Sequence, residues 1–198
     1  MINLSSAFLL LVSLVYFISF SYSKSYYFII LYKILFRGWK FLKSIGVDLN
    51  LQFPAEWNRA KEIKFAQGFT RPAPRDYVGN GPLTERESLA LYNFTLQHNF
   101  RLTLAYHTQG QVIFWKFLDY LPPSSRFIGE QFENVSGYTL EDTPTVSGYA
   151  GYKDWFIQDF NLPGYTIEAG LGENPLPISQ FNQIYNDNIG ILVLGAIL

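Results

Sequence analysis

The stretch "LTLAYHTQGQVIFW", residues 102–115, indicates the fold class of this chain. It opens with an apolar, β-prone run that ends on His107, passes through the polar residues Thr108 and Gln109, and returns to a second apolar run. Short apolar runs bounded by polar turn residues are typical of buried strands. The chain contains two histidines, and it places one of them at the end of such a strand.

The segments around this stretch alternate between helical and strand-like patterns. Strands alternating with helices predict an α/β fold whose sheet is covered on both faces. In residues 83–99, Thr84 is expected to cap the helix, with Glu87 three residues later completing a capping box. The other expectations are a short strand leading into a loop at 44–54, a surface loop at 56–81, strands at 100–107 and 164–170, an apolar run at 111–117, and helices at 151–160 and 177–198.

Composition excludes some classes of function. The chain has 198 residues, 15 Lys and Arg against 16 Asp and Glu, and a formal net charge of -1. This balance argues against a nucleic-acid partner, which requires clustered positive charge. With no cysteine, the chain can form no disulfide and no thiolate metal site. Any metal ion must therefore be held by His, Asp or Glu.

Residues 1–36 form an apolar leader that differs from the domain predicted at 37–198. Two apolar runs, residues 7–20 and 25–36, flank the single charge of Lys24. The leader is interpreted either as a signal or membrane anchor, or as a segment not native to the following domain. A genuine leader would make the protein secreted or membrane-associated, with membrane contact through residues 1–36. Otherwise a cytoplasmic location is expected.

His107 and Glu168 are the first candidates for chemistry. Each lies at the end of a β-like run, "LTLAYH" and "YTIE". In open α/β sheets, side chains at the carboxyl ends of the strands converge on the ligand site. A metal ligand and a general base from two such strands could activate a metal-bound water. The residues alone leave the alternative open that His107 is a hydrogen-bonded core residue and Glu168 a loop carboxylate.

Four segments together resemble the zinc carboxypeptidase family, and in particular its bacterial γ-D-glutamyl-L-diamino acid endopeptidases, which cut peptidoglycan stem peptides. The resemblance runs from about Phe36 to the C-terminus and implies a partial zinc carboxypeptidase-like fold, with a mixed β-sheet flanked by helices. It also implies Zn²⁺-dependent hydrolysis of peptide bonds, with peptides or peptidoglycan stem peptides as partners. The segments are "GVDLN" (46–50), "YHTQGQVIFW" (106–115), "SGYAGYKDW" (147–155) and "PGYTIEAGLGENPLP" (163–177).

The same resemblance assigns roles to individual residues. His107 matches the last zinc ligand, and Glu168 matches the general base. Asn50 matches a residue that contacts the substrate's terminal carboxylate. Tyr149 matches the tyrosine that folds over bound substrate, with Tyr152 as the second choice.

Two further positions bear on the substrate. Lys40, in "GWK", matches a cationic oxyanion stabiliser found in some members of the family. Leu51 stands where the exopeptidases of the family carry an arginine that pairs with the substrate carboxylate. An apolar side chain cannot form that ion pair, so strict C-terminal exopeptidase specificity is not expected.

The family's H-x-x-E zinc motif is absent from the sequence, because His98 is followed by Asn99, Phe100 and Arg101. A catalytic zinc site normally has three protein ligands. We therefore expect an N-terminally incomplete zinc peptidase domain that is inactive as this chain. Asp48, Glu56 and Asp142 are conceivable substitute ligands that would restore activity. The alternative function is a non-catalytic peptide-binding module, membrane-anchored or soluble.

Overall fold

The computed structural model describes residues 27–32 and 46–198 of the chain. Lys40 and most of the leader lie outside the described residues, whereas part of the second apolar run forms the first strand. In chain order the elements are β1 (Tyr27–Tyr32), η2 (Leu49–Leu51), α2 (Trp57–Ala66), α3 (Arg86–Leu96), β2 (Phe100–His107), β3 (Val112–Phe114), α4 (Ser125–Ser136), β4 (Thr139–Glu141), α5 (Tyr152–Phe160), β5 (Gly164–Glu168), η3 (Ile178–Gln180) and α6 (Phe181–Ile197).

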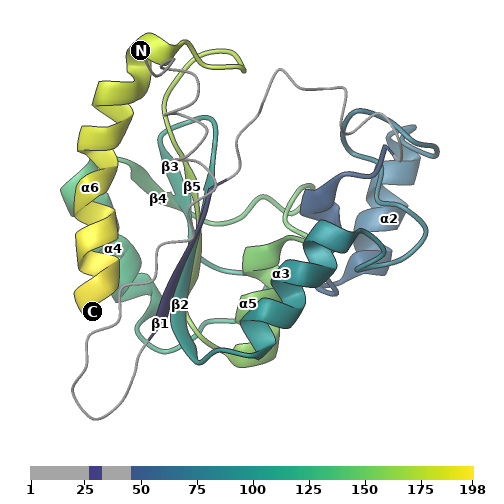
Figure 1. The fold of residues 1–198 in the computed structure, drawn as a ribbon, viewed down its shortest axis with the longest axis horizontal. Helices are drawn as coiled ribbons and strands as arrows, with labels where there is room; N and C mark the ends of the chain where they lie inside the picture. Colours follow the sequence, from purple (N-terminus) through teal and green to yellow (C-terminus); the bar gives the residue numbers. More distant parts are fainter. Residues whose placement is uncertain (1–26, 33–45) are drawn as a thin grey trace, which may run out of the picture.

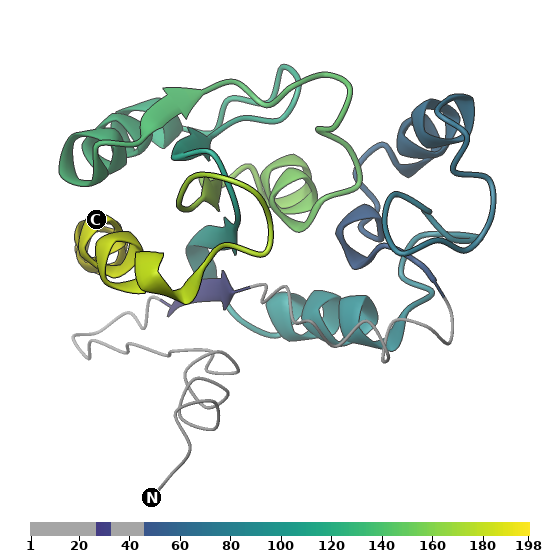
Figure 2. The same cartoon turned by 90° about the horizontal axis from the view of Figure 1, so that it is seen from above.

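The sheet has five strands in the order β1-β2-β5-β3-β4. The pairs β1–β2, β2–β5 and β3–β4 are parallel, and β3 runs antiparallel to β5. Helices α4 and α6 lie on one face of the sheet, and α3 and α5 lie on the other (Figure 1). Figure 2 shows the same layers from above, with α2 set apart from the sheet. The prediction of a mixed sheet flanked by helices is therefore confirmed.

Alternation along β2 and β5 separates the two faces of the sheet. Leu104, Tyr106 and Ile167 belong to the large apolar cluster that includes residues of α4 and α6. On the opposite face, a side chain added at Gly164 would meet Ile157 of α5. Because successive strand residues point to opposite faces, the last residues of β2 and β5 point to the α5 side.

The prediction for residues 56–81 is wrong in part, because α2 occupies Trp57–Ala66. This segment is polar on average and has a weak helical pattern, so its composition resembles that of a loop. Its two buried residues, Trp57 and Ala60, pack against Leu51 and Val78. The helix is therefore stabilised by a contact with distant parts of the chain, which local sequence does not reveal.

Of the strand and loop expected at 44–54, the structure describes residues 46–54, where residues 49–51 form a 3₁₀ turn and no strand forms. The Asp48 carboxylate accepts a hydrogen bond from the backbone N–H of Asn50 at 3.1 Å. Local bonds of this kind from Asp compete with strand pairing and favour turns.

The helix predicted at 83–99 is confirmed as α3, but the predicted cap is wrong. The N-cap residue is Glu85, and the hydroxyl of Thr84 donates instead to the side-chain oxygen of Gln52 at 3.0 Å. The predicted strands β2 and β5 and the helices α5 and α6 are also confirmed. Helix α4, an amphipathic helix between two short strands, has no counterpart among the predictions.

Among the residues that the structure describes, no helix is long and apolar enough to cross a bilayer. Tyr27–Tyr32, within the expected leader, pair with β2 as an edge strand of the sheet. The remaining leader residues, on which the expected membrane contact depends, lie outside the described ranges.

Candidate functional site

His107 and Glu168 lie side by side at the ends of β2 and β5. They are direct partners in the parallel register of these two strands, and adjacent strands lie about 4.8 Å apart. Both side chains point to the α5 face, as the alternation of β2 and β5 requires. Each is half-buried. An imidazole and a carboxylate thus lie together at the carboxyl ends of β2 and β5, close enough to act on one small ligand.

Backbone hydrogen bonds hold this edge rigidly. The N–H of Ala169 donates to the carbonyl of His107 at 2.9 Å, and the N–H of Gln111 donates to the carbonyl of Glu168 at 2.7 Å. The N–H of Gly110 donates to Gly170 at 2.9 Å. Gly110 has φ +146°, a conformation that glycine adopts at little cost. The loop after β2 therefore folds back beside Glu168 and leads into β3.

A second loop is tied to the first. The hydroxyl of Thr108 donates to the side-chain oxygen of Asn174 at 2.8 Å, and the Asn174 amide donates to the Thr108 carbonyl at 3.0 Å. The loops that follow β2 and β5 are therefore joined by a reciprocal pair of hydrogen bonds. This clamp fixes the border of the candidate site next to His107.

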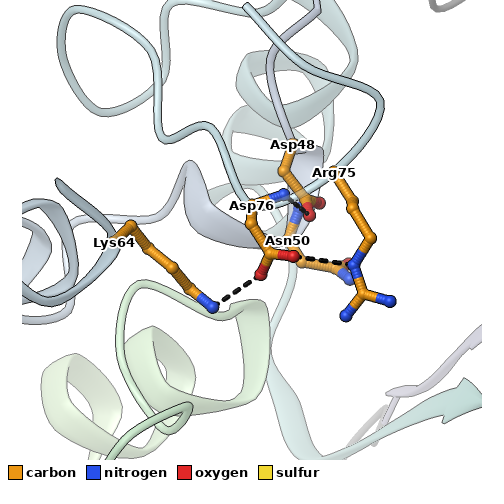
Figure 3. A network of polar contacts seen from close by, with 5 residues as sticks. All are labelled: Asp48, Asn50, Lys64, Arg75 and Asp76. Atoms are coloured by element: carbon orange, nitrogen blue, oxygen red, sulfur yellow. Dashed lines mark hydrogen bonds and ion pairs between the residues drawn. The ribbon is translucent and has the colours of Figure 1, made fainter. Parts of the chain in front are cut away.

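Asn50 is placed by a chain of charged groups (Figure 3). The Asp48 carboxylate accepts from the N–H of Asn50 and from the N–H of Asp76 at 2.9 Å. Asp76 in turn pairs with Lys64 at 2.6 Å and with Arg75 at 2.7 Å. Burial pushes the pKa of Asp76 up, but the bonds from Lys64 and Arg75 outweigh burial and hold that pKa below its usual value. The turn that carries Asn50 is thus anchored electrostatically.

Leu51, at the position where the resemblance predicts an arginine, is buried. It is 7% exposed and packs with Trp57, Ala60, Val78 and Ala150. The nearby cations of the network, Lys64 and Arg75, are both paired with Asp76, although Arg75 remains 79% exposed. Position 51 therefore contributes packing and no positive charge.

Tyr149 lies on a segment that runs next to that of Asn50. The N–H of Phe53 donates to the Ala150 carbonyl at 2.9 Å, and the N–H of Ala150 donates to Ala55 at 2.7 Å. Tyr149 is half-buried and meets Phe117 edge-on, with ring centroids 6.2 Å apart. Bonds from Arg59 to Glu62 and to the Tyr149 hydroxyl raise the pKa of the Arg59 guanidinium.

Tyr152, the second choice for the substrate-covering tyrosine, is a core residue. It is 7% exposed, and its hydroxyl lies 3.1 Å from that of Thr95. Burial raises its pKa well above the usual range, an effect that the Thr95 bond only partly offsets. Tyr149 is therefore the better placed of the two to meet a ligand.

The donor set does not fit a complete zinc site. In the described part of the chain, no group of three or more His, Cys, Asp or Glu side chains could hold a metal ion. The ring of His98 bonds the carbonyl of Phe94 at 2.7 Å, at the end of α3. Of the conceivable substitutes, Asp48 anchors the Asn50 turn, and Asp142 pairs with Lys116 at 2.8 Å. The described residues therefore do not complete a three-ligand zinc site that includes His107.

Gln52, two residues after Asn50, is a supporting residue that the sequence did not reveal. Its side chain is fully buried. Its amide donates to the carbonyls of Val78 and Gly81, and its oxygen accepts from Thr84 and from the N–H of Glu85. A surface depression of about 450 Å³, lined in part by Pro54 and Pro82, adjoins this region. Of the residues considered for the site, Glu56, a conceivable substitute ligand, lines it, and His107, Glu168, Asn50 and Tyr149 do not.

The sheet order, the paired His and Glu at its edge and the loop with Asn50 define the class of protein. The chain belongs to the zinc carboxypeptidase family, whose model matches residues 37–190. It is 49% identical over 163 residues to gamma-D-glutamyl-L-diamino acid endopeptidase 1 of Lysinibacillus sphaericus, covering 82% of this chain and 39% of that enzyme. It is 42% identical over 157 residues to the uncharacterized protein YqgT of Bacillus subtilis, covering 79% of this chain and 40% of YqgT.

Solved structures support the fold. The structure of bovine thrombin-activatable fibrinolysis inhibitor in complex with tick carboxypeptidase inhibitor matches with a TM-score of 0.58 and 16% identity, covering 84% of this chain and 60% of that one. Murein-tripeptide amidase MpaA of Escherichia coli O157 matches with a TM-score of 0.52 and 21% identity, covering 77% and 60%. The chain spans about two fifths of the length of the two curated relatives.

Proposed function

We propose that the edge formed by His107 and Glu168 is one half of a zinc-peptidase site, and that this chain does not hydrolyse peptide bonds on its own. The register pairing of these two residues carries the proposal. In this assignment His107 is a zinc ligand and Glu168 is the general base. The described residues contain no group of three His, Cys, Asp or Glu side chains that could hold a metal ion, whereas a catalytic zinc ion normally has three protein ligands.

We further propose that the substrate class is the acidic stem peptide of peptidoglycan. The relative named as a γ-D-glutamyl-L-diamino acid endopeptidase supports this choice. Asn50, held by the Asp48 carboxylate, would contact a substrate carboxylate through its amide. Tyr149 would cover the bound peptide from the neighbouring segment. Lys40 keeps its proposed role as an oxyanion stabiliser, although it lies outside the described residues.

Zinc titration by calorimetry tests the incomplete site. We expect no stoichiometric binding at micromolar zinc, for the natural chain or for His107→Ala. Stoichiometric binding that disappears in His107→Ala would show that substitute ligands complete the site. That result, together with hydrolysis of a γ-D-glutamyl-L-lysine dipeptide, would overturn the proposed inactivity.

A second candidate function, peptide binding without hydrolysis, is favoured by the anchored Asn50 turn. Titration with the same dipeptide should show weak binding that Asn50→Ala reduces. Asn58, an exposed asparagine on α2, provides the matched control variant Asn58→Ala, which should bind as the natural chain does. If Asn50→Ala and Asn58→Ala bind the dipeptide equally well, Asn50 is not part of the binding site.

A further inference from the structure

The turn that carries Asn50 is bonded to the segment that carries Arg75. One side chain, the carboxylate of Asp48, accepts from the N–H of Asn50 at 3.1 Å and, through its second oxygen, from the N–H of Asp76 at 2.9 Å. The N–H of Asp48 donates in turn to the Tyr77 carbonyl at 2.8 Å. Arg75 directly precedes Asp76. The asparagine and the arginine therefore lie on two segments that one aspartate holds next to each other.

Arg75 has hydrogen-bond donors that face water. Its Nε donates to the Asp76 carboxylate at 2.7 Å, and its side chain is 79% exposed. An arginine has five N–H donors in a planar fork, and in the part of the chain that the structure describes the two terminal nitrogens of Arg75 make no hydrogen bond or ion pair. Figure 3 shows its guanidinium and the Asn50 side chain on the same side of the network, away from Lys64. Asp76 thus fixes the guanidinium through Nε and leaves the outer edge of the fork open.

Two other positions fit an anionic ligand less well. Leu51 is buried in an apolar cluster and carries no charge. Arg59, on α2, pairs with Glu62 at 3.0 Å, and its bonds to Glu62 and to the Tyr149 hydroxyl raise its pKa. Lys64, the other cation on Asp76, is only 12% exposed. Arg75 is therefore the better placed cation to take a ligand from solution.

An amide and a guanidinium together suit a carboxylate. The outer edge of a guanidinium forms two parallel N–H···O bonds with a carboxylate, and the group stays charged throughout the range in which proteins are folded. The network of Asp48, Asp76, Lys64 and Arg75 is formally neutral. A singly charged anion therefore suits it better than a phosphate, which would need a larger excess of positive charge.

We propose that Arg75, together with Asn50, binds a carboxylate of the substrate and supplies the positive charge that Leu51 does not, an inference that rests on the proposed peptide binding at the Asn50 turn. The ligand is a peptide with a free carboxylate, either at its C-terminus or on the α-carbon of a γ-linked glutamyl residue. Arg75 is fixed by the Asp76 carboxylate before the ligand arrives, so binding orders few additional bonds.

Calorimetric titration of the chain with three ligands tests this role. The ligands are the γ-D-glutamyl-L-lysine dipeptide, its C-terminal amide, and its D-isoglutaminyl analogue, in which the α-carboxylate of the glutamyl residue is an amide. Arg75→Gln should weaken binding of the dipeptide at least about ten-fold, because a charge-assisted bidentate contact is lost. It should not affect the analogue that lacks the recognised carboxylate, and this identifies the carboxylate. Salt should weaken binding by the natural chain more than binding by Arg75→Gln, because salt screens exposed charges.

Arg126 provides the matched control. It is 74% exposed, and its Nε bonds the Glu130 carboxylate on α4 at 3.0 Å. Arg126→Gln therefore removes a similarly exposed arginine and a similar ion pair, and it should bind the dipeptide as the natural chain does. Urea unfolding followed by tryptophan fluorescence establishes that each variant is folded.

Two results of the titration would overturn the role of Arg75. One is dipeptide binding that Asn50→Ala weakens and Arg75→Gln does not, which leaves the peptide-binding function standing. The other is an equal loss of affinity for all three ligands in Arg75→Gln, because a loosened turn, and not a lost carboxylate contact, has that effect.

A second titration separates this role from the proposed function if the dipeptide does not bind. Glutarate, a dicarboxylate without a peptide bond, is added at millimolar concentration, and the NMR signals of the Nε–H groups of Arg75 and Arg126 are followed. A shift of the Arg75 signal alone supports the carboxylate site and refutes peptide binding as the function. No shift, or equal shifts of both signals, overturns the role of Arg75.

Discussion

Replacing Gln52 by leucine should loosen the turn that carries Asn50. Leucine has a similar volume and fits the buried position, but it makes none of the hydrogen bonds of the amide. The carbonyl of Val78, 2.7 Å from the amide nitrogen, and the N–H of Glu85, 3.2 Å from the amide oxygen, would lose buried partners. The bonds to Gly81 and Thr84 lie nearer to water and would be partly replaced by it.

The expected cost follows from the two buried groups. A buried donor or acceptor left without a partner costs about 1–3 kcal/mol, so Gln52→Leu should lower the free energy of unfolding by about 3 kcal/mol. Urea unfolding followed by tryptophan fluorescence measures this change, because the chain has four tryptophans. Gln52→Leu should also bind the γ-D-glutamyl-L-lysine dipeptide less tightly, because the turn that holds Asn50 would be less firmly fixed.

Gln180 provides the control. Its amide donates to the carbonyl of Leu171 at 2.7 Å, and its oxygen accepts from the N–H of Leu171 at 3.2 Å, but both bonds are exposed. Gln180→Leu should therefore cost less than about 1 kcal/mol. If Gln52→Leu and Gln180→Leu are equally stable, burial of the Gln52 amide is not what holds the turn.

Two further predictions concern pH. Burial raises the pKa of Tyr152 above its ordinary 10.0, so its contribution to stability is present below about pH 10 and is lost as the pH rises further. At neutral pH, Tyr152→Phe should lower the free energy of unfolding by about 1 kcal/mol, because the hydrogen bond to Thr95 is lost. Its melting temperature should also fall less steeply above about pH 10 than that of the natural chain. An equally steep fall in both would contradict this prediction. The carboxyl of Asp76 has a pKa below its ordinary 3.8, because Lys64 and Arg75 lower the pKa more than burial raises it. The contribution of Asp76 to the stability of the fold is therefore present above pH 3.8 and is lost as the pH falls through the lowered pKa. Asp76→Asn should show a smaller loss of stability on acidification, followed by fluorescence; a larger loss would refute the sign.

The regular elements of this fold could be predicted because their patterns are local. The alternation in "FRLTLAYH" and "GYTIE" and the helical spacing of residues 151–160 are set by neighbours in sequence. The strand-end positions of His107 and Glu168 follow from the same patterns. Their exact pairing does not, because the register between β2 and β5 depends on the packing of both strands against α4 and α6.

Other features depended on distant partners. Helix α2 is polar and forms because Trp57 and Ala60 bury against Leu51 and Val78. Thr84 resembles a helix cap, but its hydroxyl donates a hydrogen bond to the side-chain oxygen of Gln52, 32 residues earlier. In both places a tertiary contact outweighs a local preference worth about 1 kcal/mol or less.

The sequence by itself determined the family, the strand-end His and Glu, and the absence of an H-x-x-E motif, because each is a matter of residue identity and local order. The tertiary structure alone decided that His107 and Glu168 are register partners, that Leu51 is buried in an apolar cluster, and that one side of α6 remains exposed. Those facts concern which surfaces meet. Burial and register arise from packing between segments far apart in the chain, and no local pattern encodes them.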